Sequence, residues 1–444
     1  MNKSTWEHMR RRYLERHGLD GAWMLEGSEG DVDADTELKA VVVIPALAEG
    51  DELFATLDFL AANSHAALRH LLVLVVVNQR YDATPDIRRQ NQKDLMRLQE
   101  YARRQQNLRL GWIDATAAHT CMPLKRGGVG MARKIGADLV LPHIAPETLV
   151  VHLDADTRVE PDYASCMVEL AREENFAAGV IAFRHRKCSS PIQQRAIDDY
   201  ELHMRCHAAG LKWAGSPYAY PSIGSTMVSR ARAYVRAGGM NTRQAGEDFY
   251  FLQQLAKIAG IRSISRTCVY PAPRISTRTP FGTGQSMRQA CLEGEPLRLF
   301  YPLECYAILK HWLQTVTSSP SASADELLDR MHRHSASATK FFIKEGFEQV
   351  WKRLQGNHAG AAPRVKAFHE WFDALKSWRL IRMLGEQLGA PYQAEYVLED
   401  FMPLLDPTEI PGYCLPFSSK DFHHQDQAKL RKTLHHSASI RDFQ

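Results

Sequence analysis

Short apolar runs alternate with longer segments of mixed polarity through the first third of the chain. Four runs rich in Val, Ile and Leu predict buried strands at residues 40–44, 71–77, 108–113 and 149–153. The segments between them have the length and pattern of helices, at about 51–63, 86–106 and 128–140. Almost wholly apolar strands that alternate with helices predict an α/β fold with a mostly parallel, Rossmann-like sheet covered by helices on both faces.

The character of the chain changes after about residue 285. Aromatic-rich segments of helical pattern predict helices near 296–316, 337–355, 363–388 and 393–404, and the residues beyond Ser418 are polar. We therefore expect three parts: an N-terminal basic helix with an acidic linker (1–38), an α/β domain (39–285) and a helical C-terminal region with a polar tail (286–444).

The first 18 residues predict an amphipathic helix with a basic face. Trp6, Tyr13 and Leu14 recur at helical spacing, and five Lys or Arg less two Glu leave a charge of +3. Such a helix packs on the body of the protein or makes a peripheral contact with an anionic membrane, and both interpretations stay open. Residues 26–37 contain six acids and no base, which predicts an exposed linker.

Composition narrows the class of protein. The 444 residues carry 55 Lys and Arg against 51 Asp and Glu, a net charge of +4, which argues against a nucleic-acid partner. The longest apolar run has seven residues, far fewer than the roughly 20 that span a bilayer. The first 20 residues lack the apolar core of a signal peptide, and the eight cysteines show no metal-binding or disulfide spacing. We expect a cytoplasmic protein.

Two carboxylates follow the fourth predicted strand. Asp154 and Asp156 come directly after the apolar run at 149–153, at the edge of the sheet where ligands bind in such folds. Hard oxygen ligands at this spacing suit Mn²⁺ or Mg²⁺. Asp33 and Asp35 repeat the same tetrapeptide, ending in Thr, without a strand before it, so we do not expect a metal there. A phosphatase of the haloacid-dehalogenase type is an alternative, but it needs Thr or Val where Arg158 stands.

A pair of acids opens a predicted apolar helix further along the chain. Glu247 and Asp248 follow Gly246 and precede a run of aromatic and aliphatic residues. Acids in the first turn of a helix are stabilised by the helix dipole, so a capping role is the alternative to a catalytic one.

Taken together and in order, these motifs resemble the family 2 glycosyltransferases of the GT-A fold. The resemblance covers about residues 39–285 and is carried by VVVIPALAE, VVVNQ, GGVGMARKIGADL, HLDAD, PSIGSTMVSRARAYVRAGGM, AGEDFYFLQQL and RTPFGTG. It implies a metal-dependent, inverting transfer of a sugar from a nucleotide-diphospho-sugar to an acceptor hydroxyl. The acceptor is a saccharide, a lipid-linked molecule or a small molecule, and the sequence does not choose among them.

The resemblance also assigns roles to residues. Pro45, Ala46 and Glu49 would hold the nucleobase with help from Asn78; Asp154 and Asp156 would carry the metal and the donor diphosphate. Asp248 would be the catalytic base, beside Glu247. Basic residues that would contact the donor are Arg133, Lys134, Arg274 and Arg278, and for each a solvated surface charge is the alternative.

Two departures from the family pattern limit the interpretation. The second strand ends Asn78-Gln79-Arg80 in place of two acids, so the nucleobase cannot be read from it. The Gln-x-x-Arg-Trp motif of processive synthases is absent, which favours a non-processive enzyme. A sugar-phosphate nucleotidyltransferase and a catalytically idle nucleotide-sugar-binding protein remain as alternatives.

Overall fold

The computed structural model describes residues 2–28, 37–275, 282–292 and 297–405. The chain divides into two compact units. Unit 1 comprises residues 1–189 and 222–288, and unit 2 comprises residues 190–221 and 289–444. A segment from inside the predicted α/β region, residues 190–221, therefore groups with the C-terminal helices.

Unit 1 is built on a nine-stranded sheet in the order β1-β4-β3-β2-β5-β8-β7-β9-β6. Strands β4, β3, β2 and β5 run parallel to one another, whereas β8 is antiparallel to both of its neighbours. Its strands are β1 (Leu25–Ser28), β2 (Ala40–Ala46), β3 (Leu71–Asn78), β4 (Arg109–Ala115), β5 (Leu149–His152), β6 (Arg158–Val159), β7 (Ala178–Phe183), β8 (Met227–Arg230) and β9 (Arg262–Tyr270).

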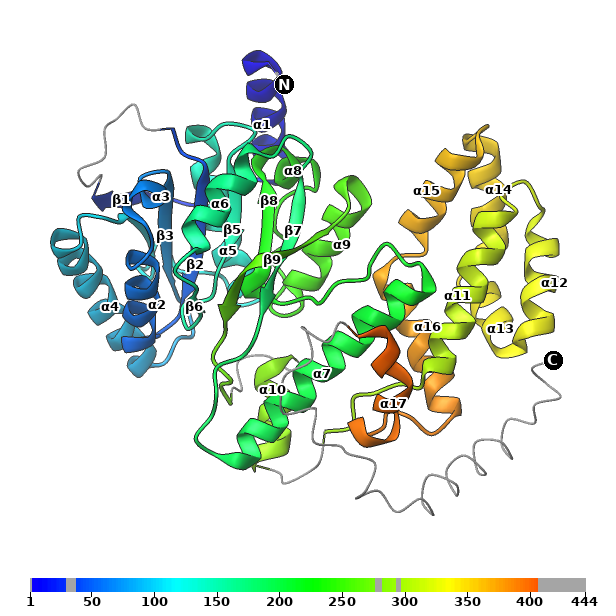
Figure 1. The fold of residues 1–444 in the computed structure, drawn as a ribbon. Coiled ribbons are helices and arrows are strands. Elements are labelled where there is room, and N and C mark those ends of the chain that lie inside the picture. Colours follow the sequence, from blue (N-terminus) through cyan, green and yellow to red (C-terminus); the bar gives the residue numbers. More distant parts are fainter. Residues whose placement is uncertain (1, 29–36, 276–281, 293–296, 406–444) are drawn as a thin grey trace. The chain divides into compact units, whose positions relative to one another are not determined.

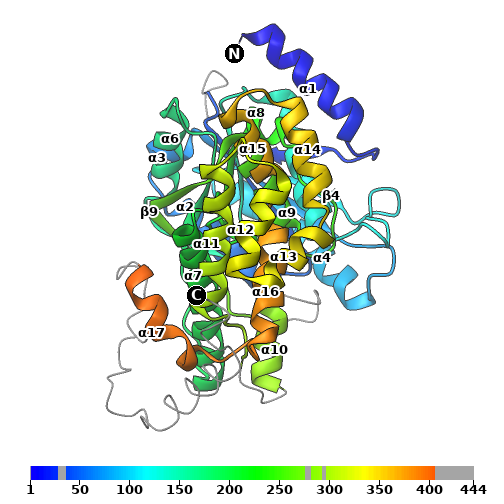
Figure 2. The same ribbon diagram turned by 90° about the vertical axis from the view of Figure 1, so that its right-hand side faces the viewer.

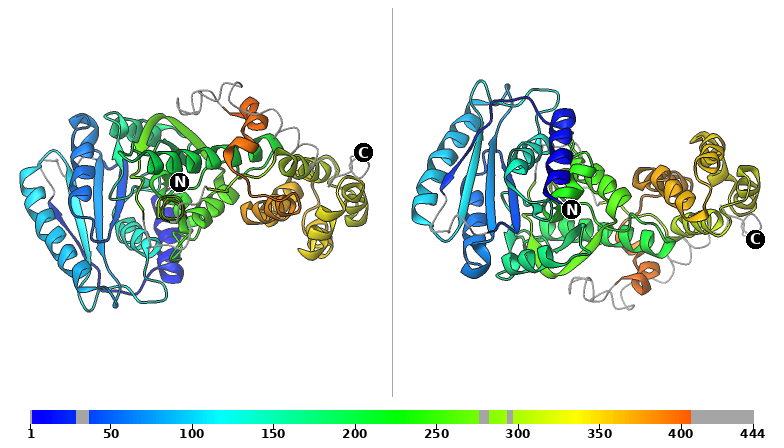
Figure 3. Two further views of the ribbon diagram at one scale, coloured as in Figure 1. Left: turned by 90° about the horizontal axis from the view of Figure 1, so that it is seen from below. Right: turned by 90° about the horizontal axis from the view of Figure 1, so that it is seen from above.

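Helices cover both faces of this sheet (Figures 1 and 3). Strands β2 and β5 are buried along their whole length because they lie between these layers, which explains their continuous apolar runs. The predicted α/β fold class is thus confirmed. The helices are α1 (Lys3–His17), α2 (Asp51–Ala61), α3 (His65–Leu68), α4 (Pro85–Arg104), α5 (Val129–Val140), α6 (Tyr163–Arg172), α8 (Ala231–Arg236), α9 (Glu247–Ala259) and α10 (Thr283–Leu292), which crosses the division between the units.

The N-terminal helix α1 is anchored on unit 1 by its apolar face. Trp6 and Tyr13 are each 3% exposed. The Trp6 indole donates a hydrogen bond to the main-chain carbonyl of Ile144 at 3.0 Å, and the helix packs against α8. Of the two interpretations of this helix, the structure shows the packed one.

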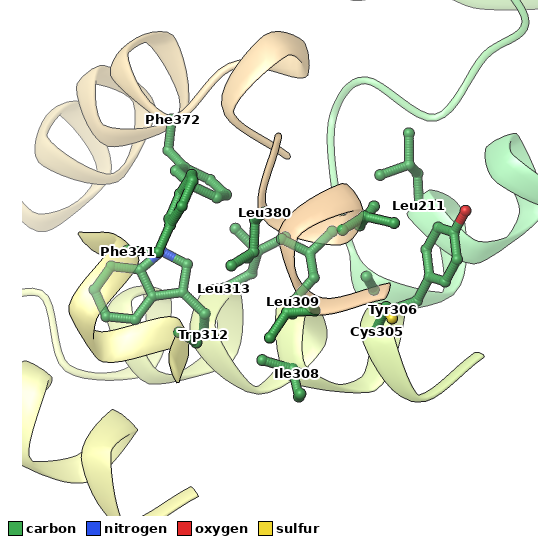
Figure 4. Packing of buried hydrophobic residues seen from close by; sticks show 14 of the residues in the cluster. Leu211, Cys305, Tyr306, Ile308, Leu309, Trp312, Leu313, Phe341, Phe372 and Leu380 are labelled. Carbon is green, nitrogen blue, oxygen red and sulfur yellow. The ribbon is translucent and has the colours of Figure 1, made fainter. Parts of the chain in front are cut away.

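Unit 2 is helical and has its own core. Its helices are α7 (Pro191–Ala214), α11 (Leu303–Ser318), α12 (Ala324–His334), α13 (Ala336–Lys344), α14 (Phe347–Asn357), α15 (Ala361–Trp371), α16 (Ala374–Gln387) and α17 (Leu398–Phe401). Figure 2 shows α11 to α16 beside one another. The fully buried Trp312 stacks on Phe342, with ring centroids 3.9 Å apart, and its neighbours on α11 fill the same cluster (Figure 4).

Several predicted boundaries change in the structure. The helix expected at 337–355 is interrupted at Gly346, whose φ of 76° lies in the left-handed region. The helix expected at 363–388 is interrupted before Asp373, whose side chain caps α16 by accepting from Lys376 N–H. Helix α12 was not anticipated, and the first residues of the predicted acidic linker form β1, paired antiparallel with β4.

Among the described residues, no helix is both long enough and apolar enough to cross a membrane.

Candidate active site

The loop after β2 holds Glu49 in a strained turn. Ala48 has φ 53°, the one positive value among the described non-glycine residues, and such a conformation costs a residue with a Cβ about 1–2 kcal/mol. Two fully buried side chains of α4 hold the loop: Asn91 Oδ1 accepts from Ala48 N–H at 2.8 Å, and Asp94 Oδ2 accepts from Gly50 N–H at 3.1 Å. The loop geometry is therefore fixed by polar groups from another element.

Asn78 links the ends of β2 and β3. In the orientation that satisfies its neighbours, its side-chain amide donates to the carbonyl oxygens of Ala46 at 3.1 Å and Val76 at 3.2 Å. Its own main-chain carbonyl accepts from Asn91 Nδ2 at 3.1 Å. The structure thus brings Asn78 to Pro45 and Ala46, the predicted nucleobase residues, where β2 ends.

Asp154, directly after β5, is held by donors on both oxygens. Oδ1 accepts from Arg133 Nη2 and Oδ2 accepts from Ser225 Oγ, each at 2.6 Å. Burial by itself would raise the pKa of Asp154, but the charge of Arg133 and these hydrogen bonds outweigh it, and the pKa is lowered. Asp154 is therefore held as a carboxylate.

Asp156 and Glu49 share one cation. Arg274, which follows β9, forms an ion pair with Asp156 and another with Glu49, at 2.6 Å between Nη1 and Oε2. Burial raises the pKa of Asp156 to about 7 against the opposing charge of Arg274. The Arg274 side chain is 39% exposed, in contrast to the buried acids that it joins.

Glu247 and Asp248 begin α9, as the sequence predicted. Glu247 is buried and lies 3.5 Å from Arg133, measured from Oε1 to Nε, so Arg133 joins this pair to Asp154. Asp248 Oδ1 accepts from Phe249 N–H at 2.7 Å, and the residue is half-buried. Burial and the Asp248 charge raise the pKa of Glu247 to about 8; burial and the Asp154 charge raise that of Asp248.

Arg133 and Lys134 point into different surroundings. Arg133 is 2% exposed and faces the acids, and it also donates to the Gly224 carbonyl at 3.2 Å. Lys134 lies away from these acids, bound to Tyr13 Oη at 2.7 Å and to Asp138 Oδ2 at 2.8 Å. The predicted donor contact Arg278, and the pair Asp33 and Asp35, lie outside the described residues.

His152 precedes Asp154 but takes no part in its contacts. It is fully buried, packs edge-to-face on Phe251, and neither ring nitrogen has a hydrogen-bond partner in the described part of the chain. Burial, followed by the charge of Arg133, lowers its pKa well below the ordinary value, so it is a neutral core histidine.

Three residues of the site were missed in the sequence. Ser225 lies within the motif PSIGSTMVSR, where a hydroxyl beside a glycine gave no reason to expect a contact with Asp154. Asn91 and Asp94 do leave a signal. They fall on the same face of the helix as the buried Leu98, and polar residues within an apolar stripe are usually hydrogen-bonded to another element.

One protein family matches the part of the chain that carries this site. A model described as glycosyl transferase family group 2 matches residues 149–291, which contain Asp154, Asp156, Ser225, Glu247 and Asp248. The match covers the segment that carries the site. The resemblance seen in the sequence is thereby confirmed, and the chain is a glycosyltransferase.

Two solved structures with a similar fold are TarS and a mannosyltransferase. TarS residues 1–349 of S. aureus in complex with UDP-GlcNAc align at a TM-score of 0.36 and 12% identity, covering 77% of this chain and 92% of that one. The mannosyltransferase PcManGT from Pyrobaculum calidifontis, in complex with GDP-Man and Mn²⁺, aligns at 0.37 and 15% identity, covering 83% and 93%. A comparison with curated proteins found no match.

Proposed function

We propose that this glycosyltransferase moves a sugar from a nucleotide-diphospho-sugar to an acceptor hydroxyl, with inversion, without processivity and with the help of a divalent cation. The observation that carries the proposal is a surplus of negative charge in one place. Five acids, namely Glu49, Asp154, Asp156, Glu247 and Asp248, gather around two arginines, Arg133 and Arg274. Such a site favours a bound cation and a group that accepts a proton.

The acids fit a divalent metal of the Mn²⁺ or Mg²⁺ type. Among the described residues no cluster of three or more His, Cys, Asp or Glu is arranged to hold a metal by itself. Both oxygens of Asp154 are engaged by Arg133 and Ser225, whereas Asp156 is paired with the partly exposed Arg274. Asp156 would be the main ligand once Arg274 turns to the donor, with Asp154 beside it. The donor diphosphate would complete the coordination, and the metal would neutralise the charge of the departing diphosphate.

Asp248 would act as the base. In its ionised form, Asp248 would accept the proton of the acceptor hydroxyl. The hydroxyl oxygen would attack the anomeric carbon from the side opposite to the diphosphate, so that the configuration inverts. Its carboxylate is oriented by Phe249 N–H, and its half-buried position allows an acceptor to reach it. Glu247, paired with Arg133, would keep the start of α9 in place.

The remaining residues would bind or position the donor. Pro45, Ala46 and Glu49 would surround the nucleobase, with Asn78 holding the two strand ends together. Arg274, being partly exposed, and Arg278 would contact the diphosphate. Arg133 would position Asp154. Lys134 could contact the donor directly only after its ion pair with Asp138 is broken.

Product analysis tests the proposal. The full chain is incubated with a panel of nucleotide-sugars, with Mn²⁺ or with a chelator. We expect slow, Mn²⁺-dependent release of nucleoside diphosphate, and stabilisation of about 2.7 kcal/mol by a ligand at 100 times its dissociation constant. Release of pyrophosphate from a nucleoside triphosphate and a sugar phosphate would show a nucleotidyltransferase. Binding of a nucleotide-sugar with no turnover, with Mn²⁺ or with the chelator, would show a catalytically idle binding protein.

A further inference from the structure

A pocket of about 640 Å³ in unit 1 is lined by bases and by no acid among the described residues. Its walls come from the end of α1, the loop before α5 and the loop that leads into α9. The basic side chains that line it are Arg16, His17, Lys125, Arg126, Lys134 and Arg243. Its volume falls within the roughly 300–1,000 Å³ of small-molecule sites.

Part of this charge has a local explanation and part does not. Lys134 is neutralised by Asp138, and Arg16 and His17 lie in the last turn of α1, where the helix dipole favours a positive charge. Lys125 and Arg126 are exposed, and neither forms an ion pair with an acid in the described part of the chain. These two, together with Arg243, form an uncompensated positive cluster.

The loops that carry this cluster are held together. Gln244 Nε2 donates to the Leu124 carbonyl at 2.7 Å, which ties the loop before α9 to the loop before α5. Arg243 lies over the Tyr250 ring, 3.8 Å from its centroid, which limits the positions of its guanidinium. Bases that repel one another are thus held by contacts that involve no acid, an arrangement that suits a multiply charged anion.

We propose that this pocket binds a phosphate-bearing group. Lys and Arg side chains are the usual partners of phosphate oxygens, and Asn241 and Thr242 in the same wall supply uncharged donors. A carboxylate has one charge and two oxygens, whereas a phosphate or diphosphate has enough of both to engage bases that come from two loops.

The pocket is joined to the start of α9. Asn241 Nδ2 donates to the Glu247 carbonyl at 2.8 Å, one residue before Asp248. A Cβ on Gly130 would lie 2.6 Å from the Asn241 carbonyl oxygen and 2.9 Å from Glu247 Cβ, so only glycine lets this loop lie so close to α5. If Asp248 is the base, as the proposed function holds, the phosphate-bearing group belongs to the acceptor.

Calorimetry with inorganic pyrophosphate in the presence of a chelator tests the pocket directly. The double variant Lys125→Gln/Arg126→Gln should bind pyrophosphate at least about tenfold more weakly than the native chain. The matched control Lys93→Gln/Arg103→Gln removes the same charge from exposed positions of α4 and should bind like the native chain. Equal affinity in both double variants, or no binding by the native chain, would overturn the proposal.

The source of the phosphate group is found with vesicles. If phosphatidic acid vesicles, whose headgroup is a phosphomonoester, capture the native chain and pyrophosphate displaces it, the group is a lipid headgroup. If pyrophosphate binds and vesicles do not, it belongs to a soluble acceptor. The proposal would be overturned if vesicles still capture the native chain in the presence of pyrophosphate and capture both double variants equally well.

The outcome is separable from that of the proposed function. Pyrophosphate binding that is lost only in Lys125→Gln/Arg126→Gln, in a chain that consumes no nucleotide-sugar, would support the pocket and refute the proposed function. If the native chain transfers sugar but the two double variants bind pyrophosphate with equal affinity, the proposed function is supported and the phosphate pocket is refuted.

Discussion

Two consecutive residues of α5 enter two buried polar networks that differ in charge balance. On the Lys134 side, one lysine meets one acid, Asp138, whose Oδ1 also accepts from Tyr13 Oη at 2.7 Å and Tyr234 Oη at 2.9 Å. On the Arg133 side, one arginine faces Asp154, Glu247 and Asp248. The first network is balanced and ties α1 to the domain.

The second network is unbalanced. Burial raises the pKa of Asp138 as well, but only on the second side do neighbouring carboxylates raise the pKa values further. Glu247 and Asp156 have pKa values raised to about 8 and about 7, because burial acts on them without enough opposing charge. The backbone is strained in the loop that holds Glu49, at Ala48. Buried charge that is not compensated within a protein is a feature of functional sites, whereas a balanced pair serves stability.

The largest expected effect is that of Asp248→Asn. This change keeps the shape and the acceptor oxygen for Phe249 N–H but removes the ability to take a proton. We expect turnover to fall by about 10²–10⁴-fold with little change in donor affinity. Steady-state kinetics and calorimetry with the donor measure the two quantities. Transfer at near native rate would make Asp248 a helix cap and place the base elsewhere.

Two tetrapeptides of identical sequence should differ in their contribution to metal binding. Asp156→Ala is expected to abolish Mn²⁺-dependent donor binding, while Asp35→Ala leaves it intact, although Asp33–Thr36 and Asp154–Thr157 have the same sequence. The difference rests on the strand before Asp154 and on the acids that Arg274 gathers. Mn²⁺ binding followed by electron paramagnetic resonance measures it. Equal losses in the two variants would refute the assignment.

The sequence predicted the core of this site better than its surroundings. Strands β2, β3 and β5 were predicted because each is almost wholly apolar, and the polar residues at their ends followed from the rule that ligands bind at that edge. The partners were not predictable in the same way. Ser225 and Arg274 reach Asp154 and Glu49 from 71 and 225 residues away, which no local pattern encodes.

Arg133 and Lys134 show the same limit at short range. Both are basic, and the sequence proposed both as donor contacts. Consecutive residues on a helix point about 100° apart, so the two must face different neighbours, but which neighbours depends on where α1 and α9 pack. The separate roles appear only with the tertiary contacts of Tyr13 and Glu247.

The pH dependence of activity should report the unbalanced network. The active form of Asp248 is the carboxylate, so activity is lost as the pH falls through its pKa. Because that pKa is raised, the acidic limb of kcat/KM should lie above the ordinary Asp value of about 3.9. Glu247 is neutral below its pKa of about 8, so Glu247→Gln should leave this limb in place. A limb at the ordinary value, or one that moves to lower pH in Glu247→Gln, would contradict the interpretation.

Substitutions in the balanced network should lower the stability of the protein and leave kcat unchanged. Tyr13→Phe removes the hydroxyl between Lys134 and Asp138 and leaves buried polar atoms without that partner, at a cost of about 1–3 kcal/mol in the free energy of unfolding. Denaturant unfolding measures it. Tyr101→Phe is the control, since its hydroxyl donates to the exposed Asp58 and should cost less. A loss of kcat with unchanged stability would mean that this network, too, serves catalysis.

The smallest expected effect concerns the strained loop beside the acids. Ala48→Gly relieves a positive φ worth about 1–2 kcal/mol but adds about 0.4–1 kcal/mol of chain entropy to the unfolded state. The net expectation is a gain of about 0.5–1 kcal/mol. Ala62→Gly, at φ −74° after α2, carries only the entropy term and should destabilise instead. Opposite signs in denaturant unfolding would show that strain is stored in the loop that holds Glu49; destabilisation by both would show that the Ala48 turn is relaxed.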